Sequence, residues 1–156
     1  MRGPGGRAIG LDVGERRVGV AIADELGLLA SPLATIERKK GDLDEIRDLA
    51  KTWGADRLIV GLPTGMSGRE GPQAAAVRGF AEQLRELLEP GTTIEFWDER
   101  LTTVVAERML RESGARRDKR RDLVDALAAA VILQGYLDAQ RSRAARLGEP
   151  RGGDAL

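Results

Sequence analysis

Apolar and polar residues alternate with a period of two in two short stretches near the start of the chain, residues 8–13 and 18–23. This period is typical of β-strands that bury one face. Four residues, Gly14-Glu15-Arg16-Arg17, separate the two stretches. The pattern therefore predicts a hairpin of antiparallel strands, and residues 30–36 could supply a third strand.

Helical and strand patterns alternate along the rest of the chain. A stripe of apolar residues at helical spacing predicts the first helix, and a proline opens the second, at a position that favours proline. The predicted elements are a helix at 43–53, a strand at 57–61, a helix from Pro72 to about Leu88, a strand at 93–97, and helices at about 103–113 and from Asp122 to about Arg143. This order indicates an α/β fold with one mixed sheet and helices on its faces.

Pairing the hairpin strands across their loop gives the sheet two different faces. The register is then Val13–Val18, Asp12–Gly19, Leu11–Val20, Gly10–Ala21 and Ile9–Ile22. One face carries large aliphatic side chains, and the other carries only Gly and Ala apart from Asp12. A carboxylate in a strand costs free energy unless it is paired or binds something. Asp12 is therefore a candidate functional residue.

The last predicted helix matches the small-residue face. Asp125, Ala128, Ala129 and Ile132 share one side of this helix. Small residues on both surfaces allow close packing, which would bring Asp125 towards Asp12. Two neighbouring carboxylates repel each other unless one is protonated or a cation lies between them. A Mg²⁺ ion bound by both Asp12 and Asp125 would remove this repulsion and explain why carboxylates stand at these two positions.

Two further acids, Asp98 and Glu99, directly follow a predicted strand. Open α/β sheets usually bind ligands at the carboxyl ends of their strands. Arg100, Thr102 and Thr103 add donors that suit phosphate groups. The acid pair could equally be an ordinary acidic start to the next helix.

The other two acids also have structural interpretations. Asp12 could pair with Arg16 or Arg17 in the hairpin turn. Asp122 and Asp125 could be an N-cap and an acid in the first turn of the last helix. The coincidence of three acids at special positions favours the functional interpretation.

A basic run precedes the last predicted helix. It consists of Arg116, Arg117, Lys119, Arg120 and Arg121. Such a run, predicted as a loop, could be a solvated surface or could bind nucleic-acid phosphates. Its position beside the acids favours phosphate binding.

The composition narrows the possible chemistry. The 156 residues include no His and no Cys, which excludes catalysis by His or thiolate and nearly all zinc sites. Carboxylates without imidazole favour a hard cation such as Mg²⁺.

No apolar run approaches the ~20 residues of a membrane span, and residues 1–7 lack the apolar core of a signal peptide. We therefore expect a cytoplasmic protein.

Four segments together resemble the YqgF/RuvX family of Holliday-junction-resolvase-like proteins and pre-16S rRNA nucleases. They are GLDVGERRVGVAIAD, VGLP followed by Gly68, DERLTT, and VDALAAAVILQGYLD. The segments stand in family order with family-like spacing, over roughly residues 8–138.

The resemblance implies an RNase H-like fold, with three antiparallel strands followed by two parallel strands and flanking helices. Residues 1–147 would form this single nuclease domain, and residues 148–156 a disordered tail. The resemblance also implies catalytic, metal-binding acids at Asp12, Glu99 and Asp125. Asp98 is the alternative candidate to Glu99. They would bind Mg²⁺ or Mn²⁺ and hydrolyse phosphodiester bonds, in processing of the 5′ end of pre-16S rRNA.

The expected nucleic-acid contacts include the basic run together with residues near the acids. These are Arg16, Arg17, Arg100, Thr102, Thr103, Arg116, Arg117, Lys119, Arg120 and Arg121. An rRNA precursor is the expected partner, with ribosomal association and either a monomer or a homodimer. The alternatives are cleavage of branched DNA by a junction resolvase, and a ribosome-assembly factor that binds nucleic acid without cleaving it.

Glu99 is where the chain departs from related resolvases. Those proteins carry their second acid after the fourth strand, where this chain has Gly61-Leu62-Pro63. In the expected strand order 3-2-1-4-5, strand five lies roughly 10 Å from strand one. The glycine-rich loop at residues 61–71 could cradle a phosphate, or could be a tight turn between a strand and a helix.

Overall fold

The computed structural model describes residues 6–64, 70–99 and 117–148. Its centre is a five-stranded sheet in the order β3-β2-β1-β4-β5. The strands are β1 (Arg7–Val13), β2 (Arg17–Ala23), β3 (Ala30–Glu37), β4 (Ala55–Pro63) and β5 (Thr93–Glu99). The first three strands pair antiparallel, and β1, β4 and β5 run parallel. This sheet confirms the expected strand order and the RNase H-like fold class.

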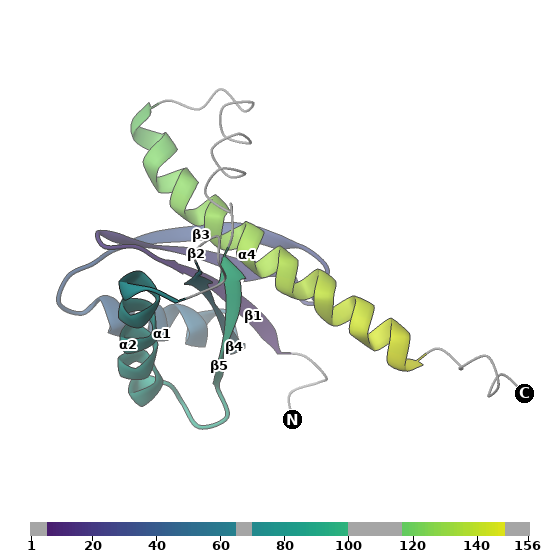
Figure 1. Cartoon of the computed structure of the whole chain (residues 1–156). Helices are drawn as coiled ribbons and strands as arrows, with labels where there is room; N and C mark the ends of the chain where they lie inside the picture. The colour runs from purple at the N-terminus through teal and green to yellow at the C-terminus, as the bar shows by residue number, and fades with distance from the viewer. Residues whose placement is uncertain (1–5, 65–69, 100–116, 149–156) are drawn as a thin grey trace, which may run out of the picture.

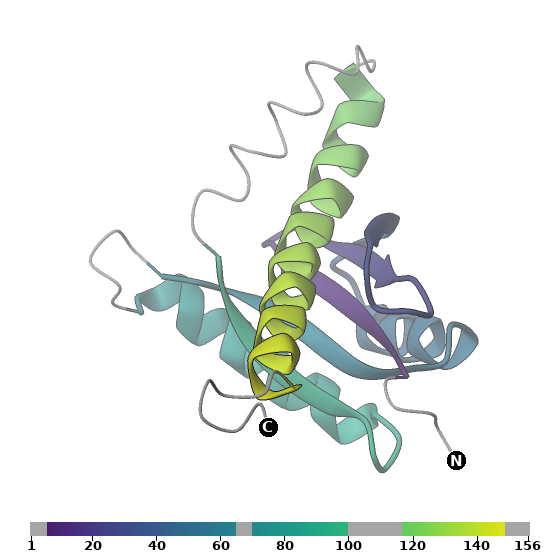
Figure 2. The same cartoon turned by 90° about the vertical axis from the view of Figure 1, so that its right-hand side faces the viewer.

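Helices cover both faces of the sheet (Figures 1 and 2). They are α1 (Asp42–Thr52), α2 (Pro72–Leu87) and α4 (Arg117–Gly148). The first two pack on one face over a core of large aliphatic side chains from all five strands. The long α4 crosses the other face over a core rich in alanine. The two layers therefore differ in how closely helix and sheet approach.

The hairpin has the register that its alternating pattern predicts. Asp12 stands opposite Gly19, and the four other expected pairs are also present. Ile9 and Leu11 belong to the core under α1 and α2, whereas Ala8 and Ala21 lie under α4. Period-two alternation therefore places Asp12 on the face that α4 covers.

Glycines in the hairpin allow α4 to lie directly against the sheet. A Cβ added at Gly10 would lie 2.8 Å from the carbonyl oxygen of Ala129 in α4. A Cβ added at Gly19 would lie 1.8 Å from the carbonyl oxygen of Asp125. Both distances are shorter than real Cβ atoms tolerate, so glycine is required at these two contacts.

The start of α4 differs from the sequence prediction. The helix begins at Arg117, five residues before Asp122, so most of the predicted basic loop is helical. Arg and Lys are good helix formers, and no Gly or Pro interrupts the stretch from Arg117 to Gln134. The interpretation of Asp122 and Asp125 as a helix cap is therefore wrong, because both lie inside the helix.

The end of α4 also lies further along the chain than predicted, at Gly148 instead of about Arg143. The predicted helix at 103–113 and the tail after Gly148 lie outside the described residues. Among the helices that the structure describes, none combines the length and apolar character needed to cross a membrane.

Candidate active site

Asp12 is the sixth residue of β1 and is half-buried. The adjacent residue Leu11 pairs with Val60 of β4, close to the carboxyl end of that parallel strand. Asp12 therefore lies at the edge of the sheet where β1, β4 and β5 end, the edge at which open α/β sheets bind ligands.

Asp125 comes to this edge on α4. Its backbone lies against Gly19, and Gly19 is the register partner of Asp12. The helical turn that carries Asp125 therefore lies over the hairpin at the level of Asp12. The structure thus brings together the two elements that carry these acids, as the small residues predict.

Arg17 binds Asp125 across 108 positions of sequence. Its Nε donates a hydrogen bond of 2.7 Å to Oδ2 of Asp125, and about a quarter to a third of each side chain is exposed. Since one carboxylate oxygen of Asp125 is held by this contact, Arg17 fixes the orientation of the carboxylate. The neighbouring Arg16 is exposed in the hairpin turn.

Asp98 and Glu99 are the last two residues of β5, so the interpretation of the pair as the start of a helix is wrong. Asp98 pairs in register with Leu62, and Glu99 with Pro63. The hydroxyl of Thr64 donates a hydrogen bond to Oδ1 of Asp98. Sequence reasoning missed Thr64, although its position directly after β4 was a signal.

The odd-numbered residues of β5 face α4. Glu95 accepts a hydrogen bond of 2.9 Å from the hydroxyl of Tyr136. Trp97 contacts the same tyrosine edge-on, with ring centroids 6.0 Å apart. Ile94 and Phe96 pack in the opposite core. The side chains of β5 therefore alternate between the two faces of the sheet as far as Trp97.

The remaining expected contact residues fall into two groups. Arg100, Thr102, Thr103 and Arg116 lie outside the described residues. Arg117, Lys119, Arg120 and Arg121 lie in the first turns of α4, which are described as backbone only.

Asp12 and Asp125 suit a hard divalent cation by their chemistry, because Mg²⁺ is bound through carboxylate oxygens and water. They come from different elements, and the Gly19 contact brings those elements close together. Within the described residues no three His, Cys, Asp or Glu side chains form a metal-binding group. The side chain of Glu99 is not part of the described structure.

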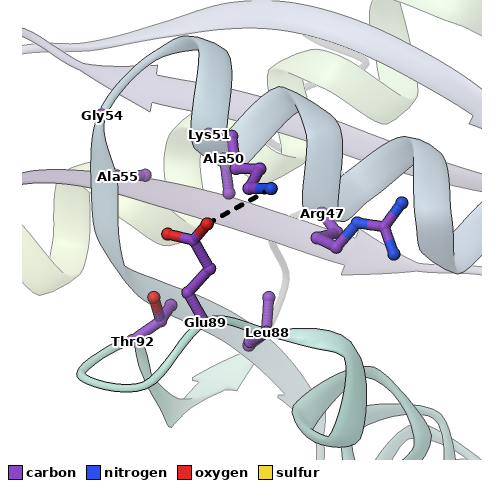
Figure 3. A pocket seen from close by; sticks show the side chains of 8 residues that line it. All are labelled: Arg47, Ala50, Lys51, Gly54, Ala55, Leu88, Glu89 and Thr92. Atoms are coloured by element: carbon purple, nitrogen blue, oxygen red, sulfur yellow. Dashed lines mark ion pairs between the residues drawn. The ribbon is translucent and has the colours of Figure 1, made fainter.

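A concave region at the other end of the sheet is separate from these acids (Figure 3). Its lining comes from the C-terminal half of α1, the residues just before β4, and the segment between α2 and β5. Lys51 and Glu89 form an ion pair of 3.2 Å across it. This contact ties α1 to the segment between α2 and β5 and is structural.

A sequence model described as "RuvX: Holliday junction resolvase" matches residues 6–139. The chain belongs to the RuvX family. Two relatives are each named "Putative pre-16S rRNA nuclease". The protein of Symbiobacterium thermophilum is 48% identical over 136 residues, which cover 86% of this chain and 93% of that protein. The protein of Clostridioides difficile is 47% identical over 135 residues, or 85% and 94% of the two chains. This family membership supports the expected nuclease function.

Solved structures similar to this member of the RuvX family confirm its fold. Thermus thermophilus RuvC in complex with a Holliday junction substrate aligns with a TM-score of 0.52 at 18% identity, covering 88% of this chain and 96% of RuvC. The fowlpox virus Holliday junction resolvase aligns with a TM-score of 0.53 at 13% identity, covering 86% and 99%.

Proposed function

We propose that this RuvX family protein is a divalent-metal-dependent nuclease that processes the 5′ end of pre-16S rRNA. The observation that carries the proposal is the contact of Gly19 with the backbone of Asp125, because it sets two acidic positions side by side at the ligand-binding edge of the sheet. The names of the two relatives supply the substrate class.

Asp12, Asp125 and Glu99 are the proposed catalytic residues and the ligands of Mg²⁺ or Mn²⁺. Glu95 and Trp97 face α4, and position 99 belongs to the same face by the two-residue repeat. Asp98 belongs to the opposite face and accepts a hydrogen bond from Thr64. This alternation favours Glu99 over Asp98 as the third acid.

The bound metal would activate water and stabilise the charge on the leaving oxygen of the phosphodiester. The protein's own contribution is to hold the carboxylates in place. Arg17 binds Oδ2 of Asp125, which leaves Oδ1 for another partner. The small-residue contact of α4 with the hairpin fixes the helix itself.

Substrate binding is assigned to the basic run at the start of α4 and to the residues around the acids. The run comprises Arg116, Arg117, Lys119, Arg120 and Arg121, and the others are Arg16, Arg17, Arg100, Thr102 and Thr103. The Arg and Lys side chains among them bind the phosphate backbone and add little sequence specificity. We place this activity in the cytoplasm, where ribosomal precursors are processed.

Cleavage assays with purified protein test the proposal directly. Labelled pre-16S rRNA and a four-way DNA junction are each incubated with the protein in Mg²⁺, in Mn²⁺ and in a chelator. We expect metal-dependent cleavage of the RNA. Cleavage of the junction alone would favour the second candidate, a resolvase, which the family description supports. Binding without cleavage of either substrate would indicate an assembly factor.

Substitutions of the two paired acids test the site. Asp12→Asn and Asp125→Asn should each abolish cleavage, because each removes a negatively charged ligand and keeps the shape of the side chain. Circular dichroism should show the native fold in both. The matched control is Asp48→Asn in α1, where the carboxylate is exposed and pairs only with Arg47 among described residues; it should cleave normally. Full activity of Asp12→Asn would refute the proposed metal site.

A further inference from the structure

The C-terminal part of α4 projects beyond the sheet (Figure 1). Leu137 is the last buried residue of the helix, which continues to Gly148. At 1.5 Å per residue, the projecting part is roughly 16 Å long. Side chains from Arg141 to Leu147 are all exposed. We call this projecting part, residues 138–148, the α4 extension.

The α4 extension is basic. It contains Arg141, Arg143 and Arg146 against a single acid, Asp138, a net charge of 3 − 1 = +2. Arg141 forms an ion pair with Asp138. Arg143 and Arg146 form no ion pair with any side chain in the described part of the chain, and their spacing of three places them on neighbouring positions of one side of the helix.

The α4 extension is separate from the part of the chain that defines the family. The RuvX family match ends at residue 139, and the core on this face of the sheet ends at Leu137. Neither the family fold nor its core therefore explains why the α4 extension carries three arginines. A favourable interaction with the helix dipole explains a cation in the last turn, such as Arg146, but falls off beyond it.

We propose that the α4 extension is a second phosphate-binding surface, which contacts the nucleic-acid backbone away from the cleavage site. This inference rests on the proposed nuclease function, which supplies a polyanion as the partner. Exposed arginines that pair with no acid in the described part of the chain match the phosphate backbone in charge and in donor geometry.

The geometry of α4 sets the length of substrate that both surfaces can share. Arg143 is 18 residues after Asp125 on one continuous helix, a separation of roughly 27 Å along its axis. At about 3.4 Å per base-pair step of a DNA duplex, roughly eight base pairs span this distance. A shorter duplex bound at the acids does not reach Arg143 or Arg146.

Salt-dependent binding to duplexes of two lengths tests the inference. The double variant R143A/R146A is compared with the wild type on DNA duplexes of about 6 and about 20 base pairs, in a chelator so that no cleavage occurs. On the long duplex, the slope of log affinity against log salt should fall by roughly 1.8, since each phosphate of duplex DNA that a cation neutralises contributes about 0.9. On the short duplex, affinity and slope should not change.

Two controls separate charge and position from folding. R143K/R146K keeps both charges and should retain the wild-type slope. R47A/R85A removes two arginines from α1 and α2, on the other face of the sheet, and should also retain it. Circular dichroism should be native for R143A/R146A and R143K/R146K, because both arginines of the α4 extension are exposed.

The outcomes distinguish this inference from the proposed function. A wild-type slope for R143A/R146A on the long duplex would overturn the inference, while metal-dependent cleavage by the wild type would still stand. An equal loss of affinity on both duplexes would also overturn it, since the arginines would then act at the cleavage site. If the wild type neither binds nor cleaves nucleic acid, the proposed function fails, and the inference fails with it.

Discussion

At Gly19 the absence of a side chain lets the backbone of α4 lie against strand β2. The same residue faces Asp12 across the hairpin. A single residue therefore determines both how closely the last helix packs and how near the acidic positions lie. Gly10 makes a second contact of this kind, with Ala129, so two close contacts fix the packing of α4 against the sheet.

Gly19→Ala should destabilise the protein and impair the site. The added methyl group would lie 1.8 Å from the carbonyl oxygen of Asp125, so α4 must shift. Overpacking of this kind costs typically about 1–3 kcal/mol of unfolding free energy, and each kcal/mol lowers the melting temperature by roughly 2–4 °C for a chain of this size. Thermal unfolding by circular dichroism measures the change.

The matched control for this substitution is Gly79→Ala in α2. A Cβ at Gly79 meets no other atom within 4 Å, and alanine is favoured over glycine inside helices by roughly 1 kcal/mol. Gly79→Ala should therefore raise the melting temperature. A Gly19→Ala variant as stable as the wild type would contradict the close packing of α4.

The two acids at the end of β5 should differ in their effect on cleavage. Glu99→Gln should cost far more activity than Asp98→Asn, because the two-residue repeat of β5 predicts position 99 on the face that α4 covers, whereas Asp98 contacts Thr64. Cleavage rates with pre-16S rRNA measure the ranking, and thermal unfolding should change little in either variant. The reverse ranking would transfer the role to Asp98. Normal cleavage by both variants would leave Asp12 and Asp125 as the only acids of the site.

At the scale of elements, the loop between β2 and β3 is held by polar contacts at both ends. Asp24 accepts hydrogen bonds from the amides of Leu28 and Leu29, at 2.7 and 3.3 Å. Gln134 of α4 accepts a hydrogen bond from the amide of Ala30 and donates one to the carbonyl of Leu28. The loop is therefore anchored to the same helix that carries Asp125.

The Asp24 contacts should weaken in acid. The hydrogen bond from the Leu28 amide lowers the pKa of Asp24 below its usual value of 3.8, with further lowering by the amides of Leu29 and Gly27 and by Arg7. A lowered pKa means that this stabilisation is present above pH 3.8 and is lost as the pH falls through the lower pKa of the folded protein. Amide chemical shifts of Leu28 and Leu29 should follow that titration. Asp24→Asn should abolish the titration, and a midpoint above pH 3.8 would contradict the assignment.

The basic run at the start of α4 should contribute to affinity without contributing to sequence preference. Alanine at Arg117, Lys119, Arg120 and Arg121 keeps a strong helix former at each position and removes four charges. The slope of log affinity against log salt should fall by about 0.7–0.9 for each phosphate that is no longer neutralised, while the ranking of different sequences stays the same. An unchanged slope would assign the run to the solvated surface.

At the scale of the whole molecule, local patterns predicted the sheet because strand alternation is a local property. The hairpin register followed from the period-two pattern of residues 8–23 alone. The start of α4 was not predictable in this way, since the run from Arg117 to Arg121 carries no apolar residue to show a helical period.

The contacts of the site were not predictable because they join distant parts of the chain. Arg17 and Asp125 are 108 positions apart, and Thr64 and Asp98 are 34 apart. Sequence reasoning placed Asp125 near Asp12 through the small residues on both surfaces. It did not predict the contact of Arg17 with Asp125, because which carboxylate an arginine meets depends on the packed helix.

The place of α4 after all five strands determines the order in which the parts of the proposed site form. Asp12 lies in β1 and Asp125 in α4, so Asp12 is synthesised well before Asp125, and chains fold from their N-terminus during translation. Until α4 emerges and docks, the glycine and alanine face of the hairpin is exposed to solvent, and the carboxylate of Asp125 is not yet beside Asp12. A nascent chain of this protein therefore completes the proposed acidic site only when α4 docks on the sheet.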